Sequence, residues 1–348
     1  MRGVNDDSST LYPKDWSMKK NILLLCGGGG PEHDISLVSS KYIEKTLQEI
    51  GLYNVIKVEI GKDKIFRKMN SDNIQGEVVE MNFKRQLIGK TTEDIHIVVP
   101  CIHGPPGETG EIQTFFELTE LPYIGCGPEA SINCFNKVTS KLWFNALSIP
   151  NTPFEFLASM EDKQRAHDLF DRYGKIFVKA ASQGSSIGCF QVFKKAELDN
   201  ALIEAFKYSS YVLVEKMVIA RELEISTYEY DGSIIATVPG EINCPSKFYS
   251  FEEKYDPNSK TTTEIVAENL SKDSIDQMRA FAIKAFTHLK LRHLSRIDFF
   301  YTDEGEIFLN EINTFPGMTP ISMFPKMMEN NGHSFNKFFK DIIAKNIL

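Results

Sequence analysis

The stretch that decides the fold reads Arg296-Ile-Asp-Phe-Phe-Tyr, then Thr302-Asp-Glu-Gly, then Glu306-Ile-Phe-Leu-Asn-Glu-Ile-Asn313. Its first and third parts alternate polar and apolar residues, which is typical of strands with one buried face, and its middle part has the composition of a turn. We therefore expect an antiparallel hairpin. A four-residue turn would place position 298 opposite position 309, and position 296 opposite position 311.

One face of this hairpin carries charged and amide side chains. Because side chains alternate between the two faces of a strand, Arg296, Asp298, Glu311 and Asn313 project to the same side. Carboxylate and amide oxygens suit hard divalent cations, and a guanidinium beside them can stabilise developing negative charge. A solvated hairpin face with an Arg–Glu cross-strand pair explains the same residues, and the hairpin alone does not decide between the two interpretations.

The composition is that of a globular chain with a mild acidic excess. Its 348 residues are too many for one compact core, so two or three domains are expected. The chain has 39 basic and 47 acidic side chains, a net charge of -8. Nucleic acid and anionic membranes need a basic footprint, so neither is an expected partner. No apolar run reaches the roughly 18–20 residues of a membrane span.

The six cysteines are scattered, without a C-x-x-C pair, and several lie in apolar runs. Buried thiols of a reducing compartment explain them better than a disulfide framework or a zinc site, so we expect a cytoplasmic protein. Residues 1–17 lack the apolar core and the cleavage site of a signal peptide. They are expected to be a disordered tail or an expression remnant ahead of a start at Met18.

The first third of the chain has strand–helix–strand order. The strand-like apolar runs are residues 21–26, 53–60 and 94–102. Apolar residues at helical spacing from Ile35 predict a helix that stops at Gly51. This order is typical of a parallel α/β sheet, whose ligand sites lie beyond the carboxyl ends of the strands. Gly27–Gly30 and His103-Gly104 both follow such strand ends.

The remaining two thirds alternate short strands and helices. The expected strands are residues 176–180, 189–193, 211–215 and 222–230, besides the hairpin. The expected helices are residues 137–147, 195–206 and 274–289. The segment Pro150-Asn-Thr-Pro153, which follows the first helix, has the composition of a boundary between domains. The polar residues 246–271 are expected to form a long loop. Past the Pro316-Gly317 turn we expect an irregular path rather than a helix.

A loop rich in glycine and serine, Ser182-Gln-Gly-Ser-Ser-Ile-Gly188, lies between two of these strands. The chain has no G-x-x-x-x-G-K-[ST] motif, so a Walker-type nucleotide site is disfavoured. The backbone N–H groups and hydroxyls of such a loop can still close over phosphates, with Lys179 as a nearby point charge. A plain hairpin tip is the alternative interpretation.

Four consecutive glycines, Gly27–Gly30, stand before Pro31-Glu32-His33-Asp34, where a strand meets a helix. Glycines let ligand and backbone approach closely, and a helix N-terminus favours an anion. A dinucleotide site is the rival interpretation, but the run is not G-x-G-x-x-G and the nearby acids would repel a pyrophosphate. Glu32 suits an ammonium group better.

These segments together resemble a known family. Arg296-Ile-Asp-Phe-Phe and Leu309-Asn-Glu-Ile-Asn-Thr-Phe-Pro-Gly-Met-Thr-Pro-Ile-Ser-Met-Phe-Pro325 resemble the D-alanine–D-alanine ligase family of the ATP-grasp superfamily. The segment from His103 to Gln113 resembles the family's H-G-x-x-G-E-D-G-x-x-Q, with Thr109 in place of aspartate. The resemblance implies an α/β fold of three-domain ATP-grasp architecture, with an N-terminal parallel-sheet (pre-ATP-grasp) domain. The implied domains are residues 1–136, 137–216 and 217–348.

The resemblance implies a site for ATP and two divalent ions, Mg²⁺ or Mn²⁺. The implied metal ligands are Asp298, Glu311 and Asn313. The implied ATP-binding residues are the phosphate lysines Lys137, Lys179 and Lys254, the loop serine Ser186, the adenine hinge Glu215, Lys216 and Met217, and the ribose-binding Glu222. The family has proline where this chain has Ala180, a scaffold change that leaves these assignments intact.

The resemblance also implies a site for the first amino acid. Glu32 would bind the amino group of the first D-alanine, within a hydrogen-bond set that includes Ser185 and Tyr255. His103 would lie beside the same substrate. By its residue type alone, a single histidine at a strand end is more often structural, so this role rests on the resemblance.

The remaining implied roles concern the intermediate and the second substrate. Arg296 and the backbone N–H of Gly317 would form the oxyanion site of a tetrahedral intermediate. Ser322 and the backbone of Met323 would bind the carboxylate of the second substrate. The implied activity is the ATP-dependent joining of two D-alanine molecules through an acyl phosphate, for peptidoglycan precursor synthesis, by an enzyme that is commonly a homodimer.

Two alternatives to this activity stay open. A sister ligase could use D-lactate or D-serine as the second substrate, but depsipeptide-forming relatives lack the Lys254-Tyr255 arrangement, so its presence favours an amine. From a different class, the chain could bind nucleotide without turnover. That alternative predicts ATP binding without phosphate release on addition of D-alanine.

Overall fold

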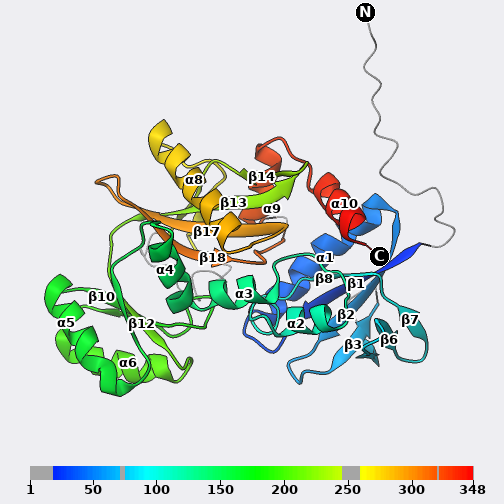
Figure 1. Cartoon of the computed structure of the whole chain (residues 1–348), viewed down its shortest axis with the longest axis horizontal. Helices are drawn as coiled ribbons and strands as arrows, with labels where there is room; N and C mark the ends of the chain where they lie inside the picture. Colours follow the sequence, from blue (N-terminus) through cyan, green and yellow to red (C-terminus); the bar gives the residue numbers. More distant parts are fainter. Residues whose placement is uncertain (1–18, 71–74, 245–258, 320, 348) are drawn as a thin grey trace, which may run out of the picture.

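The computed structural model describes residues 19–70, 75–244, 259–319 and 321–347. Their strands form three main sheets and a small three-stranded one. In Figure 1 the N-terminal sheet lies at the right, the central sheet at the lower left and the C-terminal sheet above and between them. None of the helices in these residues is both long and apolar enough to cross a membrane.

The N-terminal sheet has the strand order β4-β3-β2-β1-β8. Its strands β1 (Lys20–Gly27), β2 (Tyr53–Ile60) and β8 (Ile97–Pro100) are parallel, which confirms the prediction from strand–helix–strand order. Helix α1 (His33–Ile50) joins β1 to β2 and ends where Gly51 takes a left-handed φ of 71°. The segments after β1 and β8 therefore meet at one edge of the sheet.

The third parallel strand is shorter than the predicted residues 94–102. Residues 92–94 pair within the small sheet, and beyond Pro100 the backbone N–H groups of Cys101 and Ile102 donate back to Val99 and Pro100 instead of to a neighbouring strand. The other elements of this part are β3 (Phe66–Met69), β4 (Gln75–Val78), β5 (Glu80–Met81), β6 (Gln86–Ile88), β7 (Thr92–Asp94), α2 (Glu111–Leu118) and α3 (Pro128–Phe135).

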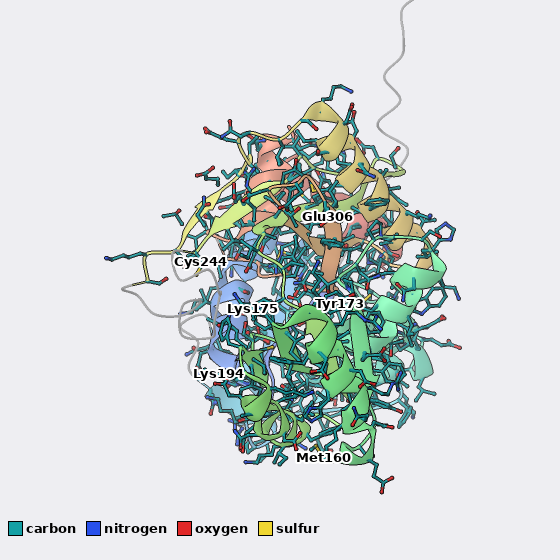
Figure 2. The ribbon with its side chains drawn as sticks, turned by 90° about the vertical axis from the view of Figure 1, so that its left-hand side faces the viewer. Met160, Tyr173, Lys175, Lys194, Cys244 and Glu306 are labelled. Carbon is teal, nitrogen blue, oxygen red and sulfur yellow. The ribbon has the colours of Figure 1, made fainter. Side chains whose placement is uncertain are left out.

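The central sheet is antiparallel, in the order β11-β10-β12-β9. Its elements are β9 (Phe154–Leu157), β10 (Ile176–Ala180), β11 (Cys189–Val192), β12 (Val212–Lys216), α4 (Lys137–Ala146), α5 (Lys163–Tyr173), α6 (Leu198–Phe206) and the short 3-10 turns η2 (Met160–Asp162) and η3 (Lys195–Glu197). The Asn136 side chain accepts the N–H groups of Val138 and Thr139 and so fixes Lys137 in the first turn of α4. In Figure 2, Met160 marks the outer end of this part and Tyr173 lies closer to the C-terminal sheet.

The C-terminal sheet has the order β16-β15-β13-β17-β18, with β14 paired to β13. Its elements are β13 (Arg221–Tyr230), β14 (Ser233–Ala236), β15 (Gly240–Asn243), β16 (Thr262–Glu264), β17 (Leu294–Tyr301), β18 (Ile307–Asn313) and α8 (Lys272–His288). The loop predicted for residues 246–271 lies partly outside the described residues, and its later part contains β16 and the cap of α8.

The prediction of an irregular path after the Pro316-Gly317 turn is wrong. The chain forms α9 (Met323–Asn330) and α10 (Phe335–Asn346), which bury their apolar faces. Pro325 is compatible with α9 because it stands in the first turn, where its missing N–H is not needed.

The hairpin β17–β18 is confirmed, but its predicted register is wrong. Asp298 pairs with Glu311 and Arg296 with Asn313, whereas Phe299 pairs with Leu309. The turn is one residue tighter than expected, because the N–H of Gly305 already bonds to the carbonyl of Thr302 and Gly305 adopts a left-handed φ of 82°. A bulge in β18 then adds one residue, which restores the predicted common face.

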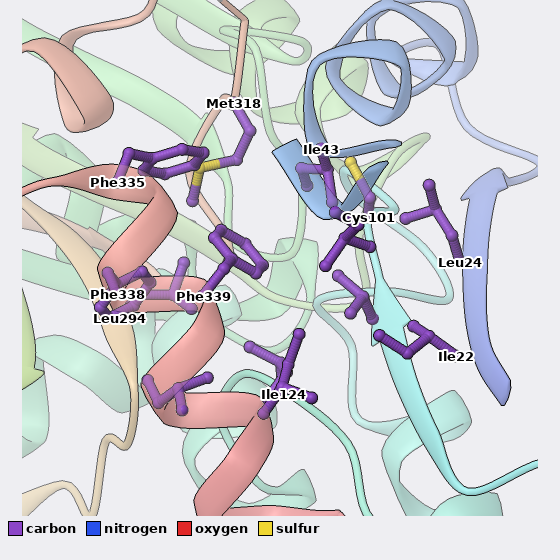
Figure 3. Close-up of a cluster of buried hydrophobic side chains, with 14 of the residues drawn as sticks. Ile22, Leu24, Ile43, Cys101, Ile124, Leu294, Met318, Phe335, Phe338 and Phe339 are labelled. Atoms are coloured by element: carbon purple, nitrogen blue, oxygen red, sulfur yellow. The ribbon is translucent and has the colours of Figure 1, made fainter. Parts of the chain in front are cut away.

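Helix α10 ties the end of the chain to its beginning. Phe335, Phe338 and Phe339 share one buried cluster with Ile22 and Leu24 of β1, as Figure 3 shows. In Figure 1 the same helix lies beside α1. The N-terminal and C-terminal sheets are thereby held at a fixed separation, so that loops from both can contribute to one site.

Candidate active site

The polar face of β17 and β18 brings the predicted metal ligands together. Asp298 Oδ2 accepts a hydrogen bond of 3.0 Å from Asn313 Nδ2, and Asp298 lies directly opposite Glu311 across the hairpin. Arg296 holds Asp298 in a bidentate pair, Nε to Oδ1 at 2.8 Å and Nη2 to Oδ2 at 2.7 Å. Burial alone would lower the pKa of Arg296, but Asp298 and Glu224 raise it well above its usual value.

Glu224 is a member of this face that we did not expect from the sequence. It lies opposite Asp298 on the neighbouring strand β13, and its Oε1 is 3.2 Å from Arg296 Nε. The single proton of that nitrogen therefore faces two carboxylates. The alternation of Glu222 and Glu224 along β13 could have revealed it, because period two places both on the face that carries Asp298.

We call residues 182–188 the flap loop, and the polar face of β17 and β18 that carries the predicted metal ligands the metal face. The two meet at Lys137. Its ammonium donates 2.7 Å to the carbonyl of Gln183 and lies 3.1 Å from Glu311 Oε2. Burial works against its charge, but the carboxylate of Glu311 raises the pKa of Lys137 above its usual value. One lysine thus connects the Gly/Ser loop of the central sheet with a predicted metal ligand of the C-terminal sheet.

Each of the two predicted carboxylate ligands is neutralised by a basic side chain of the protein: Asp298 by Arg296, and Glu311 by Lys137. Positive charge is therefore required at this face, and Asn313 adds an amide to the two acids. Among the described residues no group of three or more His, Cys, Asp or Glu side chains is placed to hold a metal. Two carboxylates and one amide nevertheless offer oxygen atoms of the type that hard divalent ions take.

The predicted adenine hinge forms a second charged cluster, at the end of β12. Lys179 is ion-paired with Glu215 Oε1, and Lys141 lies 3.1 Å from Glu215 Oε2. Lys179 also lies 5.9 Å from the ring centre of Phe300 on β17, so it stands between the central and C-terminal sheets. Burial would raise the pKa of Glu215, but the two lysines bring it down to about 2.

The other predicted nucleotide residues lie around this cluster. Glu222 is opposite Phe300, two residues along β13 from Glu224. The Lys216 ammonium lies 5.6 Å from the ring centre of Tyr173, and the N–H of Met217 donates to the carbonyl of Lys175. The remaining predicted loop residue, Ser186, has a positive φ of 61° in the flap. Lys254 and Tyr255 lie outside the described residues.

The predicted substrate residues Glu32 and Ser185 are in direct contact. Ser185 Oγ donates to Glu32 Oε1 at 2.6 Å, across 153 positions of sequence. A Cβ at Gly184 would come within 3.1 Å of the Glu32 carboxylate, and one at Gly104 within 3.2 Å. Glycines at these two positions therefore let both loops close over the carboxylate.

His103 is buried at the same edge of the N-terminal sheet. Its Nε2 lies 2.9 Å from Ser39 Oγ, and its Nδ1 lies 3.3 Å from the carbonyl of Phe315. Burial lowers its pKa, which favours a neutral imidazole at physiological pH. The histidine thereby joins the N-terminal sheet to the turn that follows β18.

Glu108 lies within the His103–Gln113 motif, and the sequence implied no role for it. In the structure it links two loops of the site. Its carboxylate accepts the N–H groups of Gly104 at 2.8 Å and of Phe315 at 3.4 Å, so it also bridges the two loops. Burial, reinforced by the charge of Glu32, raises the pKa of Glu108 to about 7. Its place one position after a buried glycine turn was the only available sign.

Ser322 and Met323 lie at the N-terminus of α9. Ser322 is the residue before the first turn, and its hydroxyl accepts the N–H of Thr319 at 2.9 Å. Met323 begins the helix, where backbone N–H groups lack intrahelical partners and the helix dipole favours an anion. A Cβ on Gly317 would approach Ser322 Oγ to 3.1 Å, so these residues form one compact turn.

These contacts arrange the predicted residues along one line. On β17, Phe300 faces the Lys179–Glu215 cluster, Asp298 follows at the metal face, and Arg296 follows towards Asn313 and the Phe315 turn. Successive residues on one face of a strand are about 7 Å apart.

The comparisons with known proteins cover nearly the whole chain. Residues 21–126 match the family described as "D-ala D-ala ligase N-terminus", and residues 143–344 match "D-ala D-ala ligase C-terminus". A D-alanine–D-alanine ligase of Shewanella piezotolerans is 54% identical over 322 residues, which are 90% of this chain and 95% of that protein. A relative from Shewanella frigidimarina with the same description is 49% identical over 336 residues.

Solved structures of D-alanine–D-alanine ligases also resemble this chain. The crystal structure of D-alanyl-alanine synthetase A from Vibrio cholerae has a TM-score of 0.88 and 50% identity, covering 94% of this chain and 98% of that one. The D-alanine–D-alanine ligase of Coxiella burnetii reaches a TM-score of 0.82 at 28% identity. The fold is thus that of the ATP-grasp ligases with a parallel-sheet N-terminal part. By sequence, by fold and by coverage, the chain belongs to the D-alanine–D-alanine ligase family.

Proposed function

We propose that this chain joins two D-alanine molecules into D-alanyl-D-alanine at the expense of ATP, as a step of peptidoglycan precursor synthesis. Relatives described as D-alanine–D-alanine ligases match over 90% or more of its length at about half identity, so it is an ADP-forming carboxylate–amine ligase. The structural observation that supports the proposal most is the face of Arg296, Asp298 and Asn313, in mutual hydrogen-bond contact beside Lys137 and Glu311.

ATP would lie between the central and C-terminal parts, which we divide as residues 137–216 and 217–348, with residues 1–136 as the substrate domain. The adenine amino group would donate to Glu215, beside Lys216 and Met217, and Glu222 would accept from the ribose hydroxyls. Lys137, Lys179 and Ser186 would hold the phosphates together with Lys254. The ion pairs of Lys137 and Lys179 with acids support this, because both ammonium groups are already held at the site.

Asp298, Glu311 and Asn313 would hold divalent metal, two Mg²⁺ or Mn²⁺ ions, which would supply positive charge for the phosphates. The bound ions would offset phosphate charge during transfer. Once Asp298 binds metal instead of Arg296, Glu224 would keep Arg296 in place by accepting from the Nε of the arginine. The Nη atoms of Arg296 would then face the reacting carbonyl. The Nε–Glu224 distance of 3.2 Å supports this second anchor.

The first D-alanine would bind with its ammonium on Glu32 and with His103 beside it. Ser185 and Tyr255 would complete the hydrogen-bond set around that ammonium. The contact between Ser185 and Glu32 supports the arrangement, because it closes the flap loop onto the N-terminal sheet. A closed flap would keep water from a reactive acyl phosphate.

The second D-alanine would place its carboxylate at Ser322 and the N–H of Met323, at the start of α9. Its amine is the nucleophile, so Tyr255 beside Lys254 should disfavour a hydroxy acid. Tyr255→Phe is expected to raise the ratio of D-alanyl-D-lactate to D-alanyl-D-alanine by a few-fold, on the order of one lost hydrogen bond. An unchanged product ratio across pH 6–9 would contradict this role and favour a determinant elsewhere.

The chemistry runs in two transfers. A carboxylate oxygen of the first D-alanine attacks the γ-phosphorus, the bond to the β-phosphate oxygen breaks, and ADP leaves. The amine of the second D-alanine then attacks the acyl carbon, and Arg296 with the N–H of Gly317 would stabilise the oxyanion. Collapse of the intermediate breaks the carbon–oxygen bond to phosphate, and the amine gives up a proton as the amide forms.

An isotope experiment tests this sequence directly. D-alanine labelled with ¹⁸O in its carboxylate should deliver one ¹⁸O atom to each phosphate released, because the carboxylate oxygen that attacked phosphorus leaves with it. Phosphate without label would contradict the acyl phosphate. Nucleotide binding without any phosphate would instead support the non-enzymatic alternative.

We also propose a homodimer in a reducing, cytoplasmic compartment. All six cysteines are free thiols, and four of them are buried, which supports the compartment. Phe83 and Leu118 are 70% and 67% exposed, and Phe83 contacts Phe115 one helical turn from Leu118, which supports a surface that a second copy covers. Sedimentation of the intact chain at micromolar concentration as a single monomeric species would contradict the dimer.

A further inference from the structure

A lysine that the proposed reaction does not use lies fully inside the central part. Lys141, on α4 one turn after Lys137, is 1% exposed, and it sits behind Glu215 as seen from Lys179. A buried ammonium is stable only when it is paired and its protons have acceptors.

Four oxygen atoms of the protein surround the Lys141 ammonium. Its Nζ donates to Thr152 Oγ1 at 2.8 Å and lies 3.1 Å from Glu215 Oε2. The carbonyl of Thr152 and Asn151 Oδ1 lie further away, at 3.3 and 3.4 Å. The Thr152 hydroxyl in turn donates to Glu215 Oε2 at 3.0 Å. Lys141 and Thr152 thus hold one oxygen of Glu215, and among the described residues Lys179 holds the other.

The two lysines therefore have different environments. Lys141 is enclosed, whereas the Lys179 side chain is 11% exposed and reaches towards Phe300 on the opposite sheet. If Lys179 moves to a phosphate, Glu215 Oε1 becomes available to a donor from the ligand. Glu215 still keeps a counter-ion, because Lys141 stays in place. Without Lys141, departure of Lys179 would leave a buried carboxylate uncompensated, which is strongly unfavourable.

We propose that Lys141 is a positioning residue for nucleotide recognition, which holds Glu215 ionised and oriented so that Lys179 can be exchanged for the amino group of adenine. This rests on the proposed role of Glu215 as the adenine acceptor. The carboxylate oxygen can accept from the 6-amino group of adenine and would repel the 6-carbonyl oxygen of hypoxanthine. Lys141 thereby sets base selectivity without touching the base.

Calorimetric binding of ADP and of inosine diphosphate to the intact enzyme tests the proposal. The wild type should prefer ADP by about tenfold or more, the value of one hydrogen bond to a charged group. In Lys141→Met the ratio of the two Kd values should fall to within about threefold, because Lys179 stays on Glu215. Thr152→Val removes the hydroxyl that donates to Glu215 but keeps the size of the side chain and the charges around it. This variant should give an intermediate ratio.

The Kd ratio is used because it does not depend on the fraction of folded protein. A purely structural role of Lys141 would lower the amount of competent protein and leave the ratio as in the wild type, which would overturn the proposal. The matched control is Lys163→Met, an exposed lysine of α5 paired with Asp199, which should leave the ratio unchanged. A second variant, Lys141→Met with Glu215→Gln, removes both members of the Lys141–Glu215 pair and should show no preference between the two nucleotides.

Failure of this inference is distinguishable from failure of the proposed function. If the wild type shows no preference, or Glu215→Gln keeps it, the adenine role of Glu215 is wrong. If Glu215→Gln loses the preference and Lys141→Met keeps it, Glu215 reads the base and only the role of Lys141 is wrong.

Discussion

Two charged clusters lie at opposite ends of the proposed nucleotide site, and they differ in their access to water. On β17 and β18 the side chains of Asp298, Arg296 and Glu311 are 14%, 22% and 26% exposed, whereas Lys141 and Glu215 are 1% and 2% exposed. A partly solvated pair can exchange its partner for a ligand at small cost, but breaking a buried pair is expensive. The first cluster is therefore suited to exchange, and the Lys141–Glu215 pair of the second cluster is suited to holding a fixed geometry.

The largest effect is expected at the exchangeable cluster. Asp298→Asn removes the central charge of the metal face and should lower the rate of phosphate release by about 10³-fold or more, because charge stabilisation during phosphoryl transfer is lost. Circular dichroism should show an unchanged fold. The control is Asp303→Asn in the exposed turn of the same hairpin, which should keep full activity. Retained activity in Asp298→Asn would contradict the metal assignment.

At the fixed cluster, the loss should appear in stability instead. Lys141→Met leaves Glu215 with one cation and should lower the free energy of unfolding by about 3–5 kcal/mol, the usual cost of removing one member of a buried pair. Denaturant unfolding measures this, with Lys163→Met as the surface control at about 0–1 kcal/mol. Equal effects of the two substitutions would contradict the assignment of Lys141–Glu215 as a fixed, buried ion pair.

A smaller effect is expected at Glu224, the second partner of Arg296. Glu224→Gln should weaken binding of a tetrahedral phosphinate analogue of the dipeptide by about tenfold, while the Kd of ADP with Mg²⁺ changes less than threefold. Glu229→Gln on the same strand serves as the control, because it lies beyond the contact with Arg296. If the substitution weakened binding of the phosphinate analogue and of ADP with Mg²⁺ to the same extent, Glu224 would act on the metal rather than on Arg296.

The smallest effect concerns Glu108, whose pKa is shifted in the opposite direction to that of Glu215. Two lysines beside Glu215 lower its pKa to about 2, whereas partial burial near Glu32 raises the pKa of Glu108 to about 7. The folded protein therefore keeps a proton on Glu108 that the unfolded chain releases near 4.5, so this contribution to stability is full below pH 4.5 and is lost as pH rises to about 7.

Replacing Glu108 tests the sign of this dependence. Glu108→Gln should gain stability relative to the wild type as pH rises from 5 to 8, by a few degrees of Tm, because the amide has no proton to lose. The comparison is the difference in Tm between the two proteins at each pH, which cancels the other titrating groups. A difference that stays constant over this range would contradict the raised pKa.

The sequence predicted much of the fold because local patterns were strong. Alternation in β17 and β18 and the glycine at the end of α1 needed no tertiary information. The common face of Asp298 and Glu311 was predicted correctly from a wrong register, because a tighter turn and a bulge each moved the pairing by one residue. Parity of register, not its value, decides which face a side chain occupies.

The missed parts share a cause, which is that tertiary burial decides them. Lys141 stands in an amphipathic helix and looks like a solvent-exposed lysine, and only the packing of Thr152 and Glu215 around it gives it a role. Glu108 and Glu224 belong to charged segments whose partners come from distant strands. The prediction of an irregular path past Gly317 also missed helix α9, whose apolar face is buried and whose Pro325 stands in the first turn.

Phosphate release by the intact chain with ATP and Mg²⁺ tests the proposed ligation of D-alanine. It is measured in parallel with D-alanine, with L-alanine, and with D-alanine plus D-lactate. We predict release with D-alanine, no release above background with L-alanine, and D-alanyl-D-alanine as the product even when D-lactate is present. Tight nucleotide binding with no release on addition of D-alanine would contradict the account.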